Sequence, residues 1–214
     1  MQMIWHGFSC VELLFTTTRG EVRVVVNPFN PSLANKTLKD MEADIVLQTH
    51  NASEASGMQA ISGNPFLIQG PGEYEVREIF FFGLEAFRTH TPGLHTIYRI
   101  EAEGIRVAHL GGLDRLLTDQ EFEFLQNIDV VIIPVGGKSV LSAAVARELI
   151  ERLEPRVVIP VSHAVSGFGD DRYVPVETFL SEMGGARTEM VNKFKAQRKD
   201  LPEDELVINV LERV

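Results

Sequence analysis

Two continuous apolar runs in the second half of the chain constrain its fold most. Residues 130–135 read VVIIPV and residues 157–161 read VVIPV. Runs of this length without polar positions are typical of strands that are buried on both faces. Between them, residues 142–153 fit an amphipathic helix with Ser142 as its N-cap. This alternation of strand and helix predicts an α/β fold in which helices cover a sheet.

The rest of the chain is predicted to contain short strands and two further helices. In its first part, strands are expected at residues 3–15, 22–26, 45–48, 66–69, 79–82 and 84–88. Later strands are expected at residues 96–101, 105–110 and 206–211, and helices at residues 118–125 and 176–183. Gly83, between two of these strands, suggests a β-bulge. We expect one domain over residues 1–214, with two pseudo-symmetric halves of about residues 1–100 and 101–214.

The composition narrows the partners that this chain can have. Its 30 acidic and 20 basic residues give a net charge of −10, which repels phosphate backbones and anionic lipids and so disfavours nucleic acid and membrane surfaces. Cys10 is the single cysteine, so no intramolecular disulfide can form and a cytoplasmic location is expected. No apolar run is long enough for a membrane-spanning helix. The expected partner is an unknown small molecule or protein, with a homo-oligomer as an alternative.

The short apolar segment 45–48 leads into a place where a metal-binding motif would be expected. Binuclear metallo-hydrolases continue such a strand as His-x-His-x-Asp-His, and in this chain the four positions are His50, Ala52, Glu54 and Ala55. An alanine side chain has no donor atom for a metal ion. The motif therefore keeps one histidine and one carboxylate.

Seven short segments, in a specific order and spacing, carry a resemblance to a known family. They are residues 5–9 (WHGFS), 27–29 (NPF), 43–50 (ADIVLQTH), 70–76 (GPGEYEV), 108–112 (AHLGG), 132–137 (IIPVGG) and 158–160 (VIP). Through them the chain resembles the metallo-β-lactamase fold superfamily, specifically its small branch related to the L-ascorbate-6-phosphate lactonases. The resemblance implies an α/β, four-layer αβ/βα sandwich with a metal site at one edge, between two sheets.

The resemblance also implies where seven metal ligands would lie. Those positions are His50, Ala52, Glu54, Ala55, His90, Gly112 and Ser162. Two keep a histidine, Glu54 replaces an aspartate, and four have lost the ligand, among them Gly112 in place of the aspartate that bridges two ions. Catalytic zinc uses three protein ligands and an open position. The sequence therefore argues against a two-metal mechanism and leaves His50, Glu54 and His90 as a remnant site for one zinc or manganese ion.

Other polar residues leave alternatives open. The late histidine of the family is displaced by one position to His163, which would face away on a strand but could point inward in a loop. His109 is expected to be a hydrogen-bonded core histidine, and His95 could line the former metal site. Asp114 could form an acid/base pair with His109 or His163. Asn27 stands where the family usually has an aspartate.

Coordinated loss of ligands with the scaffold preserved predicts a non-catalytic binding or assembly module that carries no metal. The alternative is a residual mononuclear metal-dependent hydrolase, acting on a small ester, lactone or phosphorylated sugar. Residues 79–82 (IFFF) are the apolar run to inspect for a partner surface, although a buried strand is the favoured interpretation.

Overall fold

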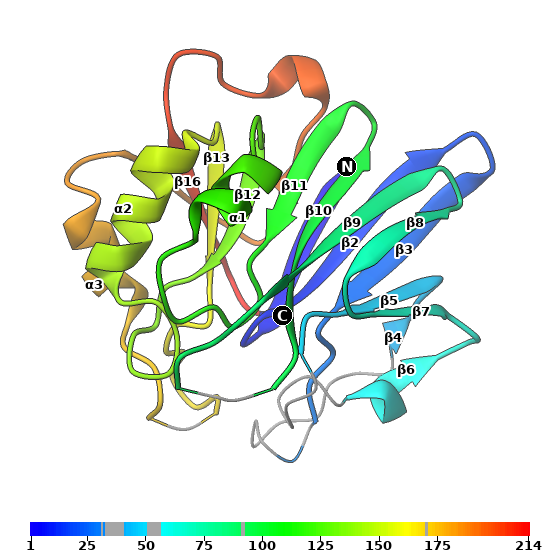
Figure 1. Cartoon of the computed structure of the whole chain (residues 1–214), viewed down its shortest axis with the longest axis horizontal. Coiled ribbons are helices and arrows are strands. Elements are labelled where there is room, and N and C mark those ends of the chain that lie inside the picture. The colour runs from blue at the N-terminus through cyan, green and yellow to red at the C-terminus, as the bar shows by residue number, and fades with distance from the viewer. Residues whose placement is uncertain (31, 33–40, 51–56, 91–92, 170) are drawn as a thin grey trace.

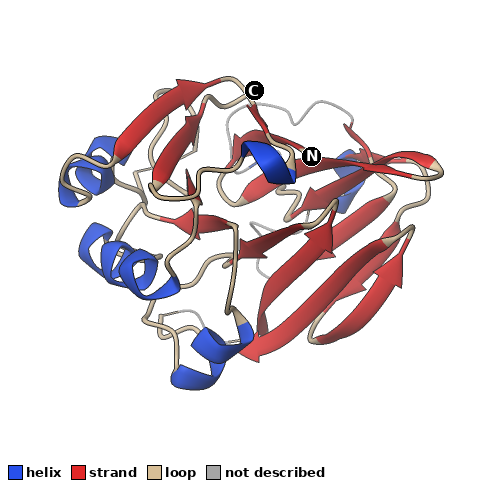
Figure 2. Cartoon of the chain, turned by 90° about the horizontal axis from the view of Figure 1, so that it is seen from above, coloured by secondary structure: helices blue, strands red, loops and turns tan. Residues whose placement is uncertain are grey.

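Two β-sheets pack face to face, and helices cover the outer face of the larger sheet (Figures 1 and 2). The computed structural model describes residues 1–30, 32, 41–50, 57–90, 93–169 and 171–214. The α/β sandwich expected for the metallo-β-lactamase fold is therefore confirmed.

The smaller sheet has six strands in the order β15-β1-β2-β3-β5-β7. They are β1 (Gln2–Gly7), β2 (Cys10–Thr17), β3 (Gly20–Val26), β5 (Ile45–Gln48), β7 (Phe66–Gln69) and β15 (Phe194–Lys195). β1, β2 and β3 are antiparallel, whereas β3, β5 and β7 run parallel. A short parallel pair, β4 (Met41–Glu42) and β6 (Ile61–Ser62), and a 3-10 helix at Met58–Ala60 lie in the same part of the chain.

The larger sheet has eight strands in the order β14-β16-β13-β12-β11-β10-β9-β8. They are β8 (Gly72–Val76), β9 (Ile79–Ala86), β10 (His95–Ala102), β11 (Ile105–His109), β12 (Val130–Pro134), β13 (Val157–Val161), β14 (Arg187–Val191) and β16 (Val207–Leu211). The strands from β11 to β16 are parallel to their neighbours, and those from β8 to β11 are antiparallel. The helices are α1 (Asp119–Phe124), α2 (Ala143–Leu153) and α3 (Val176–Glu182), with a 3-10 helix at Arg198–Asp200.

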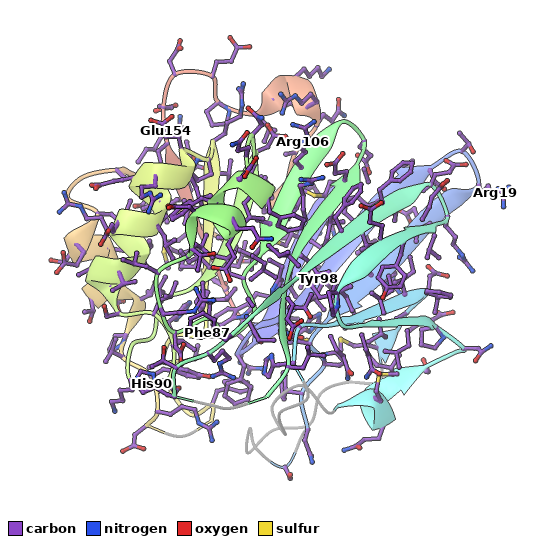
Figure 3. All side chains as sticks on the ribbon, viewed as in Figure 1. Arg19, Phe87, His90, Tyr98, Arg106 and Glu154 are labelled. Carbon is purple, nitrogen blue, oxygen red and sulfur yellow. The ribbon has the colours of Figure 1, made fainter. Side chains whose placement is uncertain are left out.

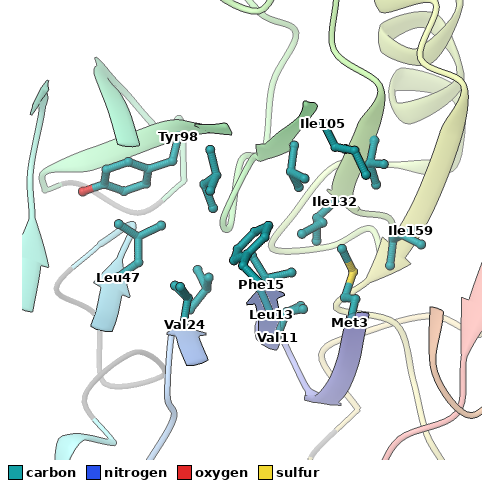
Figure 4. Close-up of a cluster of buried hydrophobic side chains, with 14 of the residues drawn as sticks. Met3, Val11, Leu13, Phe15, Val24, Leu47, Tyr98, Ile105, Ile132 and Ile159 are labelled. Carbon is teal, nitrogen blue, oxygen red and sulfur yellow. The ribbon is translucent and has the colours of Figure 1, made fainter. Parts of the chain in front are cut away.

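Apolar side chains fill three layers. Between the sheets, Phe15 and Leu47 of the smaller sheet belong to one cluster with Ile105 and Ile132 of the larger (Figure 4). A second cluster joins the outer face of the larger sheet to the helices, and a third covers the outer face of the smaller sheet. β12 and β13 are buried along their whole length because both faces of the larger sheet are covered there.

The three predicted helices are present, and α1 and α2 begin at residues whose side chains cap them. Thr118 and Glu121 make a reciprocal capping box at the start of α1, and Ser142 caps α2. After α3, Gly184 adopts a positive φ of 62°, which ends the helix at little steric cost. No helix in the described part of the chain is long and apolar enough to cross a membrane.

Some local expectations were wrong. Residues 3–15 form two strands, because Gly7 (φ 120°) and Phe8 (φ 47°) turn the chain between β1 and β2. Gly83 makes no bulge, since β9 pairs with β8 and β10 without a register shift. A Cβ at Gly83 would lie 2.8 Å from Tyr98 Cε1, so this glycine lets a buried ring approach the strand. Strands β4, β6, β8, β14 and β15 were not expected.

The apolar run at residues 79–82 divides between the two faces of β9. Ile79 and Phe81 are buried in the core between the sheets, as a buried strand requires, whereas Phe80 is 43% exposed. The guanidinium of Arg99 covers the Phe82 ring at 4.5 Å. Half of the run therefore belongs to the core, and Phe80 is the one exposed side chain in it.

Candidate functional site

Several strand ends meet at one edge of the sandwich, which we call the carboxyl edge. β3, β5, β11, β12 and β13 all end there, and β10 begins there with His95. A bridge between His50 and His95 and a 2.7 Å hydrogen bond from Thr96 N–H to Thr49 O tie the two sheets together at this point. Carboxyl ends of parallel strands are where open α/β sheets place binding sites. Figure 3 shows His90 and Phe87 at this edge and Glu154 and Arg106 at the opposite one.

The His50 ring is held by a short polar chain. Thr49 Oγ1 lies 2.7 Å from His50 Nδ1, and Asn27 Nδ2 donates to Thr49 Oγ1 at 2.9 Å and to Ser9 Oγ at 3.0 Å. Asn27 Oδ1 accepts the backbone N–H of Thr49 at 2.8 Å. Asn27 has a φ of 50°, a conformation that asparagine tolerates better than most residues. The asparagine thus orients Thr49, which orients His50.

His95 is a neutral imidazole at the centre of this edge. Its side chain is fully buried, and its ring centroid lies 5.9 Å from that of His50. Burial, with the nearby His50 and Arg88, lowers the pKa of His95 to about 3. Nε2 lies 3.1 Å from Leu110 O and donates to it, so Nδ1 is the acceptor; within the described residues Nδ1 has no partner. The expectation that His95 lines the site agrees with this position.

His109 is a core histidine, as predicted. Its Nε2–H donates to Ser9 O at 3.1 Å, and its Nδ1 accepts from Gly111 N–H at 3.0 Å. Burial lowers its pKa to about 4, so the ring is neutral. Both ring nitrogens are occupied, which leaves no lone pair for a metal ion or for acid/base chemistry with Asp114.

His90 turns toward Asp114. Its side chain is 62% exposed, and its Nδ1 lies 3.0 Å from Asp114 Oδ2. The Asp114 carboxylate also accepts the backbone N–H groups of Thr89 and His90, both at 2.8 Å. Burial opposes ionisation of Asp114, but these bonds outweigh it and hold its pKa below the ordinary value. Asp114 therefore holds the loop at residues 89–90, and the alternative of an acid/base pair with His109 or His163 is not formed.

The guanidinium of Arg88 lies in contact with the position where a side chain of residue 112 would begin. A Cβ at Gly112 would be 3.3 Å from Arg88 Cζ and 3.5 Å from both Nη atoms. Arg88 Nη2 donates to Ser139 O at 3.3 Å. Arg88 was not among the predicted site residues, and its only signal in the sequence is a basic side chain two positions before His90.

The end of β13 directs Ser162 and His163 into separate surroundings. Ser162 has a φ of 53° and donates its backbone N–H to Phe8 O at 2.9 Å. The buried His163 ring packs against Trp5 with centroids 4.5 Å apart, and its Nδ1 lies 3.3 Å from Ala164 O. His163 therefore lies against the core between the sheets. Its side chain points inward, toward Trp5.

The described residues do not fit a metal centre. They contain no group of three or more histidine, cysteine, aspartate or glutamate side chains that could hold an ion. Ala52, Glu54 and Ala55 lie outside them. Of the predicted remnant ligands, His50 lies at the carboxyl edge and His90 is turned to Asp114. Glu54 lies outside the described residues and stays a prediction.

Residues 2–162 match the family model described as the beta-lactamase superfamily domain. The chain belongs to this superfamily. A metal-dependent hydrolase of Thermococcus onnurineus is 25% identical over 177 residues, covering 67% of this chain and 78% of the relative. One from Enterococcus faecalis is 28% identical over 200 residues, covering 76% and 86%.

A solved structure agrees with the superfamily assignment. It is a proposed Zn-dependent hydrolase of the metallo-β-lactamase superfamily from Thermotoga maritima, with a TM-score of 0.79, 26% identity and 99% of each chain covered. Members of the superfamily similar to this chain are thus named as metal-dependent hydrolases.

Proposed function

We propose that this superfamily member is a non-catalytic binding module whose carboxyl edge no longer assembles a metal centre. The observation that carries the proposal is the guanidinium of Arg88 against Gly112. In the family pattern this position supplies the carboxylate that bridges two ions. In this chain the permanent positive charge of Arg88 lies beside residue 112 instead.

The charge balance opposes a metal ion at this place. A dication about 5 Å from a guanidinium is repelled by about 7 kcal/mol at an effective dielectric constant of about 20. A bridging carboxylate would offset that repulsion, and Gly112 has none. The exposed His90, held by Asp114, is also a poor ligand for an ion at His50.

A residual mononuclear hydrolase is the second candidate, acting on a small ester, lactone or phosphorylated sugar. It is favoured by the names of the relatives and by the ordered His50 ring, which Thr49 and Asn27 hold in place. It requires His90 to leave Asp114 and Glu54 to join the site. The non-catalytic proposal needs neither rearrangement.

Metal content tests the two candidates directly. Protein purified without a histidine tag is measured by plasma mass spectrometry as isolated and after loading with zinc or manganese. We expect far less than one ion per chain in both states. About one tightly held ion per chain, lost in His50→Ala, would contradict the proposal and support the hydrolase.

A gain of metal by substitution sharpens this test. The change of Ala52, Ala55 and Ser162 to histidine with Gly112→Asp is expected to raise zinc uptake little, since the new carboxylate pairs with Arg88. Adding Arg88→Ala is expected to raise it clearly. Equal uptake with and without Arg88 would show that the guanidinium does not govern metal binding.

A further inference from the structure

Arg88 is a half-buried cation without an acidic partner in the described structure. Its guanidinium has five N–H donors. One of them, on Nη2, donates to Ser139 O at 3.3 Å. Its Nε is buried and has no partner there. Leaving a buried charge without its partner is strongly destabilising. An unpaired guanidinium in this setting is therefore a place where an anion is stabilising.

Two other partly buried arginines show how this chain normally treats such a charge. Arg115 binds the carboxylate of Glu121 with two N–H groups, at 2.7 and 2.8 Å. Arg99 forms an ion pair with Glu101 at 2.8 Å. Arg88 forms no ion pair within the described residues. Asp114 is close enough for its charge to interact with that of Arg88, but the Asp114 oxygens accept hydrogen bonds from the backbone N–H groups of Thr89 and His90.

A second cation follows β12 close to Arg88. Lys138 precedes Ser139, the residue whose carbonyl accepts from Arg88. The Lys138 ammonium is exposed and donates to the carbonyl of Asp171, and it too lacks a carboxylate partner among the described residues. The sequence Gly-Gly-Lys-Ser at residues 136–139 thus places a second basic residue at the carboxyl edge, adjacent in the chain to the carbonyl that Arg88 binds.

His95 provides an independent pointer to a ligand. Its Nδ1 is a buried acceptor without a partner in the described residues, and a buried polar group without a hydrogen bond is destabilising. The positions that a Cβ would take at Gly111 and Gly112 contact His95 and Arg88 respectively, the Cε1 of His95 at 2.7 Å. An acceptor therefore lies near the Arg88 guanidinium.

We propose that Arg88 and Lys138 bind a small oxyanion, a carboxylate or a phosphate, and that His95 accepts a hydrogen bond from a hydroxyl of the same ligand. This inference rests on the proposed function, because it assigns a ligand to the carboxyl edge in the metal-free chain. A guanidinium matches the two oxygens of a carboxylate or phosphate with parallel N–H donors. With a net charge of −10 the whole protein repels polyanions, so the ligand is small and held by direct bonds.

The test is a titration of untagged, chelator-treated protein with inorganic phosphate, glycolate and acetate, followed by calorimetry and thermal unfolding. We expect saturable binding with a stoichiometry near one for phosphate or for glycolate, whichever source of the oxyanion the site takes. Arg88→Gln is expected to weaken binding by about tenfold or more, and Lys138→Gln by about threefold to tenfold. Lys138 is exposed, so its substitution leaves folding intact if Arg88→Gln does not fold.

Arg19→Gln is the matched control, since it removes the same charge from an exposed turn at the far end of the β2–β3 hairpin (Figure 3). We expect it to bind like the parent chain. Weakening equal to that of Arg88→Gln, or no saturable binding to any probe, would overturn the oxyanion site. A tighter affinity for glycolate than for acetate is expected from His95, and equal affinities would overturn its part.

Metal dependence separates this inference from the proposed function. Binding that vanishes with chelator and returns with zinc would overturn both, because the anion would then be bound by a metal ion. Metal-free protein that binds none of the anions would overturn the oxyanion site alone. Binding unchanged by chelator, and lost in Arg88→Gln, is the expected result.

Discussion

At the scale of single residues, two glycines at the carboxyl edge face different neighbours. A Cβ at Gly136 would lie 1.9 Å from the backbone oxygen of Ser162, whereas one at Gly112 would meet the end of the Arg88 side chain at 3.3 Å. Backbone cannot move aside, but a long side chain can. We therefore expect Gly136→Ala to lower the free energy of unfolding by about 2–3 kcal/mol and Gly112→Ala by less than about 1 kcal/mol.

Urea denaturation of the two variants checks this prediction, with the unchanged slope of the transition as the control for two-state unfolding. Equal losses would mean that the ends of β12 and β13 can separate without cost. They would also mean that the position of Ser162 is not set by its contact with Gly136.

At the scale of elements, the start of α1 depends on one buried carboxylate. Glu121 accepts the backbone N–H of Thr118 at 2.7 Å and binds Arg115 with both oxygens. Burial opposes its ionisation, but the bonds from Arg115 and Thr118 hold its pKa below the ordinary value. We expect Glu121→Ala to cost about 3 kcal/mol, since it leaves a buried arginine unpaired, and Thr118→Ala to cost about 1 kcal/mol.

Replacing Arg115 by methionine and Glu121 by leucine together provides the control for this element. The pair of changes removes both charges and is expected to cost less than Glu121→Ala alone. Thermal and urea unfolding measure these variants together with the two single changes, Arg115→Met and Glu121→Leu. A double variant as unstable as the sum of its single changes would show that the two side chains are not coupled.

At the scale of the whole molecule, buried neutral histidines make stability depend on pH. Burial lowers the pKa of His95 to about 3 and of His109 to about 4, from 6.5 in the unfolded chain. Between pH 6.5 and about 4 the unfolded chain binds protons that the folded chain cannot, so stability is lost as the pH falls. Two such groups together remove about 4 kcal/mol between pH 7 and pH 5.

Urea denaturation at pH 7 and pH 5 measures this loss, and His109→Gln is its internal control. The glutamine amide can donate to Ser9 O and accept from Gly111 N–H, yet it does not titrate. We expect the variant to lose about half as much stability over this interval. Asp114 and Glu121 lose their contribution to stability at lower pH, because the pKa values of their carboxyl groups lie below the ordinary 3.8 and 4.5. An unchanged pH dependence in His109→Gln would contradict the assignment.

Features that depend on neighbouring residues could be predicted from the amino-acid sequence. Continuous apolar runs identified β12 and β13, Ser142 marked the start of α2, and the ordered motifs identified the superfamily. Such features are readable because burial pattern and capping are set by residues close together in the chain. His109 was recognised as a core histidine for the same reason, since it stands in an apolar strand.

Only the tertiary structure decided which distant groups meet. It placed Arg88 against Gly112, His90 on Asp114, and His163 on Trp5. Each contact joins residues from strands or loops whose relative position follows from the packing of whole sheets, to which a local pattern contributes little. The sequence therefore indicated which positions differ from the ligand pattern of the family, whereas the fold revealed the cation beside one of these positions.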